Sequence, residues 1–502
     1  MSSTRFSSGD VDGGQVLTDN DSLYPAQINE LREVTTTGSG VYNVLDYGAI
    51  GDGVTSDSAA IQATIDAAAL GNGSVYVPQG IYRLTTQITV KKGVYLQGCK
   101  STACPRWNKA DAEWVTTWYG SVFAVDWGAG GEAKANAAVL MAGFSGIDGI
   151  NFYWPSQSGD TAAPVQYPPG IAFAEEESGE GEVNGNILQV IVRNIVMSNP
   201  WIGILFSQLH ERLTIDNIHM TAWKIGIVVD GSTDVDKVSN IHMNPNVSYI
   251  GPWATNNPRG YHLLNNTCVG IWIGGADQIE ISKAFVYGFY YAFRFEKYEI
   301  GDNKSVCLTQ SAAEGCMIAV RSYGTRGLVM SDCIFGNHSV LGSAVIWIGN
   351  VNMNDESDAI QINNCKVWTS ATQGLLCHYV NHIMVNNCEF QDLNSLNPGW
   401  TGACITLENC AGFKFTNNTV QQDGSNTSGY HMHLTNVDGF VIDNNIFRFQ
   451  TRAGANILCD VCTKGRMPLN FQEEPGNGTG VTIAGTCTDV TSTEWLVYTR
   501  LH

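Results

Sequence analysis

The chain has 502 residues, of which only 15% are charged, and it carries a net charge of −20. This excess of negative charge argues against nucleic acid or an anionic membrane surface as the main partner. The sequence contains no run of 18 apolar residues, so no insertion into a membrane is expected.

Residues 1–40 are polar and rich in Gly, Ser, Asp and Thr. This composition predicts a stem or attachment segment without its own core, with at most a short helix between Pro25 and Val34. Residues 1–20 lack a basic start followed by an apolar stretch, so we expect no secretory signal there.

Residues 41–98 open the folded part with an alternating strand and a glycine-rich turn. Thr55 or Ser56 would then cap an amphipathic helix that ends at Gly71. Two further strands follow between residues 73 and 84. A helix in this place would cover the open end of a repetitive β-structure.

The runs from Tyr42 to Gln62 and from Gly73 to Tyr82 closely resemble the N-terminal module of pectate-lyase-like right-handed β-helix proteins. They look most like the version found in bacteriophage tailspikes that degrade surface polysaccharides. The resemblance implies the fold, a homotrimer and a substrate cleft on the outer face. It does not fix the reaction, because the family includes hydrolases, lyases and binding-only members.

Three acidic residues of this module match the family motif, but they resemble turn and cap residues rather than catalysts. We therefore carry no catalytic residue over from the family. These three residues are Asp46, Asp52 and Asp57.

Residues 99–185 are irregular and rich in Trp, Gly and Ala, so residues 41–185 are predicted to form the N-terminal cap and the first irregular coils. An acidic run between Glu175 and Glu182 is better explained as a solvated loop than as a cation site, because it lacks the spacing of a calcium loop.

Residues 186–465 contain a repeat in which two apolar residues at spacing two precede a polar pivot and two more follow it. Spacing two is the strand period, so each copy predicts a strand, a sharp bend and a second strand. Most neighbouring pivots are 22 to 32 residues apart, which is the range of a solenoid. The predicted pivots are Asn194, Asn217, Asn240, Lys283, Gln310, Asp332, Asn364, Asn387, Asn417 and Asn444.

A third apolar strand precedes each new copy, as at 203–206, 226–229 and 270–273. Three short strands in each repeat predict an all-β fold, a right-handed parallel β-helix with an N-terminal capping helix. Asn suits the pivot column because it tolerates a left-handed bend and its amide both donates and accepts hydrogen bonds. We interpret this column as scaffold, and Cys333, Cys365 and Cys388 as small apolar fillers of one inward column.

The outer face of the third strand is the predicted substrate face, since alternation fixes which side chains leave the core. Its middle coils would expose Asp230, Trp272, Arg294, Glu296, Arg321 and Trp347, with Arg321 in the same outward column as Asp230 and Glu296. Exposed Trp rings can stack on sugars, and Arg and carboxylates can hydrogen-bond hydroxyl and acidic groups. We therefore predict substrate-binding roles for Trp272, Arg294, Arg321 and Trp347.

The one long separation between pivots, 43 residues, indicates an insertion of about twenty residues in this region. Loops inserted on a rigid scaffold are where binding residues concentrate. From this insertion we assign Trp253 and Tyr261 to substrate binding as well.

Glycoside hydrolysis usually needs two carboxyl groups. Two coils at roughly 4.8 Å per coil separate Asp230 from Glu296 by roughly 10 Å, close to the spacing of inverting enzymes. We predict Glu296 as the acid and Asp230 as the base, against the alternative that both form surface ion pairs with Arg294 and Arg321. Rival carboxylates are Glu299, Asp302, Asp355, Glu356, Asp358, Glu389 and Asp392.

Two other chemistries stay open on the sequence. His219 and His242 would lie one coil apart, but without a third ligand they predict an edge or interface rather than a metal site. A β-elimination lyase would need a base such as Arg294, Arg321 or Tyr261 beside a group that neutralises an acid.

Residues 466–502 are less regular and predict a C-terminal cap or trimer contact. The sequence as a whole predicts a tailspike-like depolymerase of a capsule or O-antigen, acting by hydrolysis without a cofactor. It would work on a virion tail, attached to other virion proteins through residues 1–40. The alternatives are a polysaccharide lyase, a binding-only receptor or structural protein, and a secreted glycan-degrading enzyme.

Overall fold

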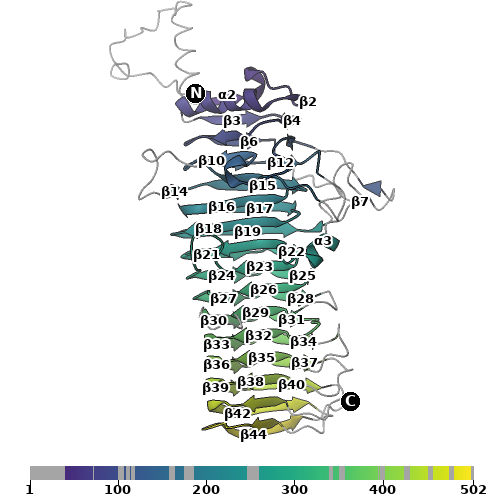
Figure 1. The fold of residues 1–502 in the computed structure, drawn as a ribbon, viewed down its shortest axis with the longest axis vertical. Coiled ribbons are helices and arrows are strands. Elements are labelled where there is room, and N and C mark those ends of the chain that lie inside the picture. Colours follow the sequence, from purple (N-terminus) through teal and green to yellow (C-terminus); the bar gives the residue numbers. More distant parts are fainter. Residues whose placement is uncertain are drawn as a thin grey trace, which may run out of the picture.

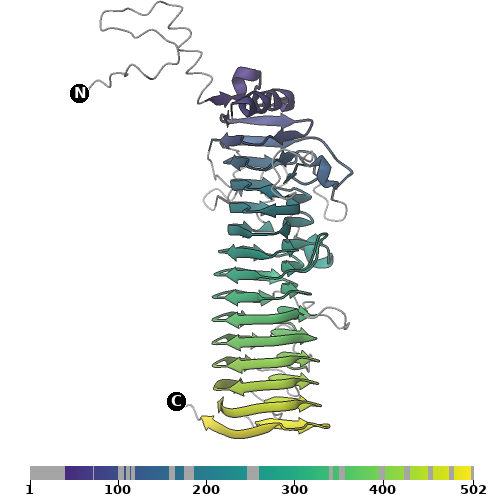
Figure 2. The ribbon, with the colours of Figure 1, turned by 90° about the vertical axis from the view of Figure 1, so that its left-hand side faces the viewer.

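The computed structural model describes residues 40–71, 73–99, 107–108, 113–114, 119–157, 164–174, 186–245, 259–337, 343–349, 357–393, 395, 402–422, 430–449, 456–473 and 480–498. They form a tall stack of coils with a helix across the N-terminal end (Figure 1, Figure 2). The predicted stem before Gly40 and the acidic run from Glu175 to Glu182 lie outside the described residues.

Parallel strands from successive coils pair into two long sheets, so the predicted parallel β-helix is confirmed. The 27-stranded sheet holds the strands on either side of the pivots: β1 (Val41–Asn43), β2 (Asp52–Ser56), β3 (Ser74–Val77), β4 (Gly80–Leu84), β6 (Tyr95–Gly98), β9 (Ser121–Val125), β11 (Gly146–Asp148), β12 (Ile150–Tyr153), β15 (Ile191–Ser198), β17 (Thr214–Thr221), β19 (Val235–Met243), β21 (Gln278–Ser282), β22 (Phe285–Tyr287), β24 (Val306–Thr309), β25 (Ala312–Cys316), β27 (Leu328–Ser331), β28 (Ile334–Asn337), β30 (Ser357–Asn363), β31 (Lys366–Trp368), β33 (Val380–Asn386), β34 (Glu389–Leu393), β36 (Ala411–Thr416), β37 (Thr419–Gln422), β39 (Asp438–Asp443), β40 (Asn445–Phe449), β42 (Thr463–Glu473) and β44 (Thr491–Tyr498).

The 15-stranded sheet holds the third strand of each coil. Its members are β5 (Ile88–Val90), β10 (Val139–Met141), β13 (Ile171–Phe173), β14 (Ile187–Leu188), β16 (Ile202–Glu211), β18 (Ile225–Ser232), β20 (Val269–Gly274), β23 (Tyr291–Phe295), β26 (Ile318–Ser322), β29 (Ile346–Gly349), β32 (Leu375–His378), β35 (Ile405–Glu408), β38 (Met432–Thr435), β41 (Ile457–Asp460) and β43 (Val481–Ala484).

The other elements are short. They are the antiparallel pair β7 (Trp107–Asn108) and β8 (Glu113–Trp114), the helices α2 (Ser58–Leu70) and α3 (Arg259–Leu264), and the 3-10 turns η1 (Val44–Tyr47) and η2 (Lys134–Asn136). No helix in the described part of the chain is long and apolar enough to cross a membrane.

Every predicted pivot has a left-handed backbone, with φ between 48° and 58°. The asparagine pivots also bond to one another: Asn217 donates to Asn194 at 2.8 Å, Asn387 to Asn364 at 2.8 Å and Asn444 to Asn417 at 2.6 Å. These three bonds join neighbouring coils along the axis, and the positive φ confirms the pivots as sharp bends.

The core follows the alternation of both sheets and runs the length of the stack. Cys333, Cys365 and Cys388 are buried, unbridged and aligned, as predicted. Below Cys388 the same inward column continues as Asn418 and Asn445, whose side-chain oxygens accept the backbone N–H of Cys388 at 2.7 Å and of Asn418 at 2.9 Å. Small thiols and amides thus fill the space behind the pivots.

The N-terminal helix α2 ends before Gly71, as predicted, but its start is different. Thr55 and Ser56 belong to β2, and the residue before the helix is Asp57. The Asp57 carboxylate accepts the backbone N–H of Ile50 at 2.7 Å and so holds the preceding turn instead of the helix. The predicted cap is therefore wrong.

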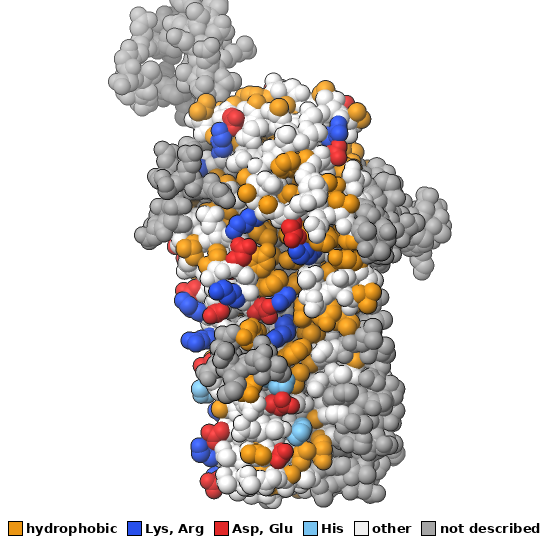
Figure 3. Space-filling model, viewed as in Figure 1, with side chains coloured by type: hydrophobic (Ala, Val, Ile, Leu, Met, Phe, Trp, Pro, Cys, Tyr) orange, Lys and Arg blue, Asp and Glu red, His pale blue; other side chains and the backbone are white. Residues whose placement is uncertain are grey.

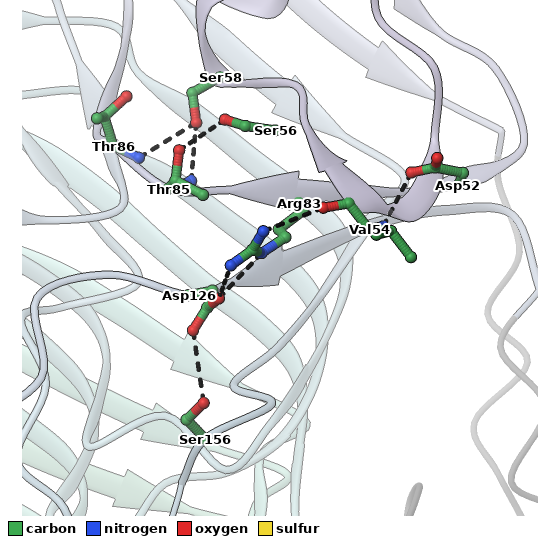
Figure 4. Close-up of polar contacts among 9 residues, drawn as sticks. All are labelled: Asp52, Val54, Ser56, Ser58, Arg83, Thr85, Thr86, Asp126 and Ser156. Carbon is green, nitrogen blue, oxygen red and sulfur yellow. Dashed lines mark hydrogen bonds and ion pairs between the residues drawn. The ribbon is translucent and has the colours of Figure 1, made fainter.

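Polar contacts attach this end to the coils beneath it (Figure 4). Arg83 donates to Asp126 at 2.6 Å and to the carbonyl oxygen of Val54 at 3.0 Å. The Ser58 hydroxyl accepts the backbone N–H of Thr85 at 2.9 Å. At the other end, β42, β43 and β44 extend both sheets, so the described part of 466–502 continues the coils. The predicted trimer contact there stays a prediction.

We expect Asn387→Ala to lower the free energy of unfolding by about 1–2 kcal/mol, because alanine strains the left-handed bend and removes the amide bond to Asn364. Asn387→Gly should cost less, since glycine adopts positive φ without a steric penalty. Chemical denaturation of both variants measures this order. A glycine variant no more stable than the alanine variant would contradict the role of backbone strain at this corner.

Candidate functional site

Four predicted binding residues form one outward column of the 15-stranded sheet. Trp272 is paired with Arg294, Arg294 with Arg321, and Arg321 with Trp347, on β20, β23, β26 and β29. The predicted register for Arg321 is wrong by one outward step: it aligns with Arg294, not with Glu296. We call these four residues the Trp–Arg ladder; Figure 3 shows acidic and basic side chains close together over these middle coils.

Within the ladder the guanidinium groups lie over the aromatic rings. The Arg294 Cζ is 3.9 Å from the centre of the Trp272 ring, and the Arg321 Cζ is 4.7 Å from that of Trp347. One face of each ring is therefore covered by its neighbour, and the ladder presents guanidinium groups beside the rings. The covered faces are closed to sugar stacking, and stacking on the other faces stays a prediction.

Glu296 follows β23 directly and pairs with Arg294, whose Nε donates to Oε1 at 2.7 Å and whose Nη2 contacts the same oxygen. Its side chain is 15% exposed. The backbone oxygen of Glu296 accepts the Trp272 Nε1–H at 2.9 Å. A carboxylate that is ion-paired with a guanidinium suits a base or nucleophile better than the predicted acid.

Asp230 is 0% exposed, so the prediction that it lies open on this face is wrong. Its Oδ2 accepts hydrogen bonds from the Ser207 hydroxyl at 2.9 Å and from the backbone N–H groups of Glu299 and Ile300 at 3.0 and 3.1 Å. The cause is Gly274, the outward neighbour of Asp230 on the next coil. A Cβ there would meet the Tyr298 nitrogen at 2.7 Å, so only glycine lets residues 297–301 fold back over the aspartate.

This fold-back brings a second carboxylate to Asp230. Glu299 is 51% exposed, and its Oε2 lies 2.8 Å from the Ser207 hydroxyl and 3.0 Å from the Lys134 Nζ. Burial raises the pKa of Asp230, which the hydrogen bonds only partly offset. For Glu299, burial is outweighed by the bonds from Ser207 and Lys134, which lower its pKa. One hydroxyl thus bridges a carboxyl that tends to hold a proton and one that tends to lose it.

Sequence reasoning missed His378 on β32, and it placed Glu408 on β35 outward on this face without giving it a role. His378 Nδ1 lies 3.1 Å from Glu408 Oε2, and burial, together with the charge of Arg321, lowers the pKa of His378. All four residues of β32 are buried, so the strand shows no apolar–polar alternation. Its place one coil after β29 was the signal that could have revealed it.

The insertion is seen only in part. Trp253 lies outside the described residues, and Tyr261 lies on α3, which projects at the side of the stack (Figure 1). The Tyr261 ring is half-buried, 5.8 Å from the ring of Trp223 and 6.4 Å from that of Trp201. In this position Tyr261 holds the insertion against the coils, and its predicted contact with substrate stays a prediction.

His262 anchors the same helix. Its Nε2 lies 2.8 Å from the carbonyl oxygen of Ala222, and its ring stacks at 4.3 Å on Phe289. The side chain is fully buried, and burial lowers the pKa of His262 to about 4. The histidine is therefore neutral at pH 7 and serves to dock α3.

Two other features of the described residues lack a set of metal ligands or a pair of carboxylates. The rings of His219 and His242 lie 5.4 Å apart and tilted by 57° on the 27-stranded sheet, and no group of three metal-binding side chains occurs in the described ranges. A hollow of about 540 Å³ near the C-terminal coils has no carboxylate among its described lining residues, Asn417, Asn418, Thr419, Asn444, Ile446, Arg448 and Phe471.

Residues 41–118 match the family described as rhamnogalacturonase A/epimerase, pectate lyase-like. Over 65 residues, 11% of this chain, the sequence is 52% identical to mannuronan C5-epimerase AlgE4 of Azotobacter vinelandii and covers 12% of that protein. It is 48% identical over 65 residues to alginate lyase 7 of the same organism, covering 8% of it. It is also 47% identical over 57 residues to the plasmin and fibronectin-binding protein A of Streptococcus pneumoniae, covering 8% of it.

Similar folds occur among solved structures. The A-module of AlgE4 covers 90% of this chain and is itself covered completely, with a TM-score of 0.46 and 14% identity. Tailspike protein 3 of bacteriophage CBA120 covers 94% of this chain and is covered over 65% of its own length, with a TM-score of 0.39 and 10% identity. The match over residues 41–118 confirms the resemblance predicted from the N-terminal module: this segment is similar to that of pectate-lyase-like proteins.

Removing the Asp230 carboxylate should release the fold-back. We expect Asp230→Ala to speed amide hydrogen exchange at Glu299 and Ile300 by at least about tenfold, because both N–H groups lose their acceptor. Asp230→Asn, which keeps one oxygen, should show a smaller effect. Glu296→Gln is the control, and equal exchange in all three variants would show that the aspartate does not hold the segment.

The buried His262 predicts an acid-sensitive fold. Between its ordinary pKa of 6.5 and its folded pKa of about 4, the unfolded chain binds more protons, so stability falls as pH falls through this window. The shift corresponds to about 3 kcal/mol at most. Unfolding midpoints at pH 7 and pH 4 should differ less in His262→Phe than in the native sequence. The same loss in both would refute this source of acid sensitivity.

Proposed function

We propose that the chain is a tailspike-like depolymerase that binds a bacterial capsule or O-antigen along the middle coils of the 15-stranded sheet and cleaves it by glycoside hydrolysis. The observation that carries the proposal is the placement of Glu296 beside the Trp–Arg ladder. There a carboxylate and two guanidinium groups share one outward strip. Carboxylates perform the acid–base steps of most glycosidases, and guanidinium groups hold hydroxyl and acidic substituents.

The burial of Asp230 changes the roles assigned from sequence. In this proposal Glu296 is the base or nucleophile, and the proton comes from the hydroxyl-bridged pair of Asp230 and Glu299. Burial raises the pKa of Asp230 and so favours its protonated form, and Glu299 is the member that reaches solvent. The Ser207 hydroxyl, 2.9 Å from one and 2.8 Å from the other, provides a path between them. Asp230 then acts through Glu299, because Asp230 itself does not reach solvent.

A polysaccharide lyase is the second candidate, and one observation favours it. Arg321 and the neutral His378 lie close enough for the arginine charge to lower the pKa of the histidine. A cation that neutralises a uronic acid beside a group that accepts a proton is what β-elimination requires. A binding-only protein is the third candidate, because a relative that shares the N-terminal module is named for binding plasmin and fibronectin.

The assembly is also a proposal. From the tailspike resemblance we infer a homotrimer that acts outside the host cell from a virion tail, with residues 1–40 joined to other virion proteins. A secreted enzyme with the same site is the alternative location.

Mass spectrometry of products from a panel of capsular and O-antigen polysaccharides tests the reaction. We expect oligosaccharides at whole-repeat masses with one water added. Glu296→Gln should slow their release by about 10²–10⁴-fold, the usual contribution of an acid–base group. The matched control is Glu280→Gln, an exposed carboxylate on β21 of the 27-stranded sheet. Unsaturated products without added water would replace the hydrolase with the lyase, and binding without cleavage would leave a receptor-binding protein.

A further inference from the structure

Arg321 differs from three other partly buried arginines of the coils. Arg83 pairs with Asp126, Arg193 with Asp148 and Arg294 with Glu296. Arg321 is only 8% exposed, yet within the described residues it has no ion pair. Its Nη1 donates to the carbonyl oxygens of Ser322 at 2.7 Å and Trp347 at 3.5 Å.

An arginine in this setting lacks full compensation for its lost hydration. Burial lowers the pKa of Arg321, although the nearby charge of Glu296 acts in the opposite direction. The rings of Trp347 and Tyr323, 4.7 and 5.7 Å from the Cζ, supply weak cation–π attraction. A buried charge is stabilised far more by a hydrogen-bonded partner of opposite sign. The partner that Arg321 lacks among the described residues is therefore an anion.

The remaining nitrogens of Arg321 are placed to receive one. Nε and Nη2 donate no hydrogen bond to the described residues, and neither nitrogen is sealed from solvent. On the next coils His378 contributes a ring whose Nδ1 faces Glu408, and its Nε2 is likewise not sealed. A guanidinium edge beside a neutral imidazole suits an acidic group flanked by a hydroxyl.

We propose that Arg321 receives an acidic substituent, a carboxylate or a phosphate, carried by the glycan. This assignment rests on the proposed glycan-binding function and names its substrate class. It also agrees with the ladder geometry, because both guanidinium groups lie on the outward strip, over the Trp rings. With a net charge of −20, the chain repels a polyanion elsewhere, so the acidic group is held at a guanidinium that has no carboxylate partner among the described residues.

Saturation-transfer NMR with glucuronate and with glucose, on the full chain at fixed ionic strength, tests the assignment. Glucuronate should bind saturably and glucose should not. Arg321→Gln should weaken glucuronate binding by about tenfold or more, the scale of a lost charge-assisted bond. Arg466→Gln, an exposed arginine on β42, is the matched control. Arg321→Lys, which keeps the charge without the fork, should give an intermediate loss and guards against a folding defect in the glutamine variant.

Inorganic phosphate added as a competitor identifies the acid. If phosphate displaces glucuronate at a concentration far below the one that chloride needs, the site is assigned to a phosphate-bearing glycan. If phosphate does not displace glucuronate, the site is assigned to a carboxylate. Both outcomes support the anion site. Equal binding of glucose and glucuronate, or no effect of Arg321→Gln, would overturn it. If a neutral polysaccharide from the panel is cleaved as fast as acidic ones, the charge inference fails while the depolymerase stands. If no polysaccharide of the panel is cleaved, the proposed hydrolysis alone is refuted.

Discussion

The whole molecule depends on a left-handed residue at one corner of each coil. Parallel strands can stack coil on coil only if each coil turns at the same place, and a positive φ produces that turn in a single residue. Asparagine lowers the cost of this conformation and adds a bond to the asparagine of the next coil. The corner therefore fixes the register of both sheets, and the register places side chains in columns. The positions of the functional residues therefore follow from the left-handed corner, a backbone constraint at other residues.

The candidate site arises where the columns depart from regular filling. Gly274 leaves a gap in an outward column, and residues 297–301 occupy it, so that Asp230 becomes buried and Glu299 meets Ser207 from a distant part of the sequence. In the neighbouring outward column, planar groups occupy four successive coils and form the Trp–Arg ladder. A missing side chain and a run of flat ones thus convert a uniform surface into a strip with distinct charges.

The repeat, the pivots and the inward columns could be predicted because they depend on local period alone. The register of Arg321 could not, since a strand with period two looks the same after a shift of two residues, and Ala319 fitted the ladder position as well. Strand β32 escaped because burial at all four positions removes the alternation. The burial of Asp230 depends on a segment about seventy residues away that folds back through a glycine gap, and no local pattern encodes such a contact.

Separation of scaffold and site follows from the same geometry. Pivots and inward residues bond or pack along the axis, whereas outward residues of the 15-stranded sheet contact their neighbours in the column and, at Asp230, a segment that folds over the column. Exchanging an outward side chain therefore alters local charge without disturbing the corner bonds. The ladder shows what such an exchange can produce: Glu296 neutralises Arg294 while Arg321, one coil away, keeps no carboxylate partner in the described residues. The polarity of the strip is thus set by single positions on a fixed frame, and the position with uncompensated charge is the one that a ligand completes.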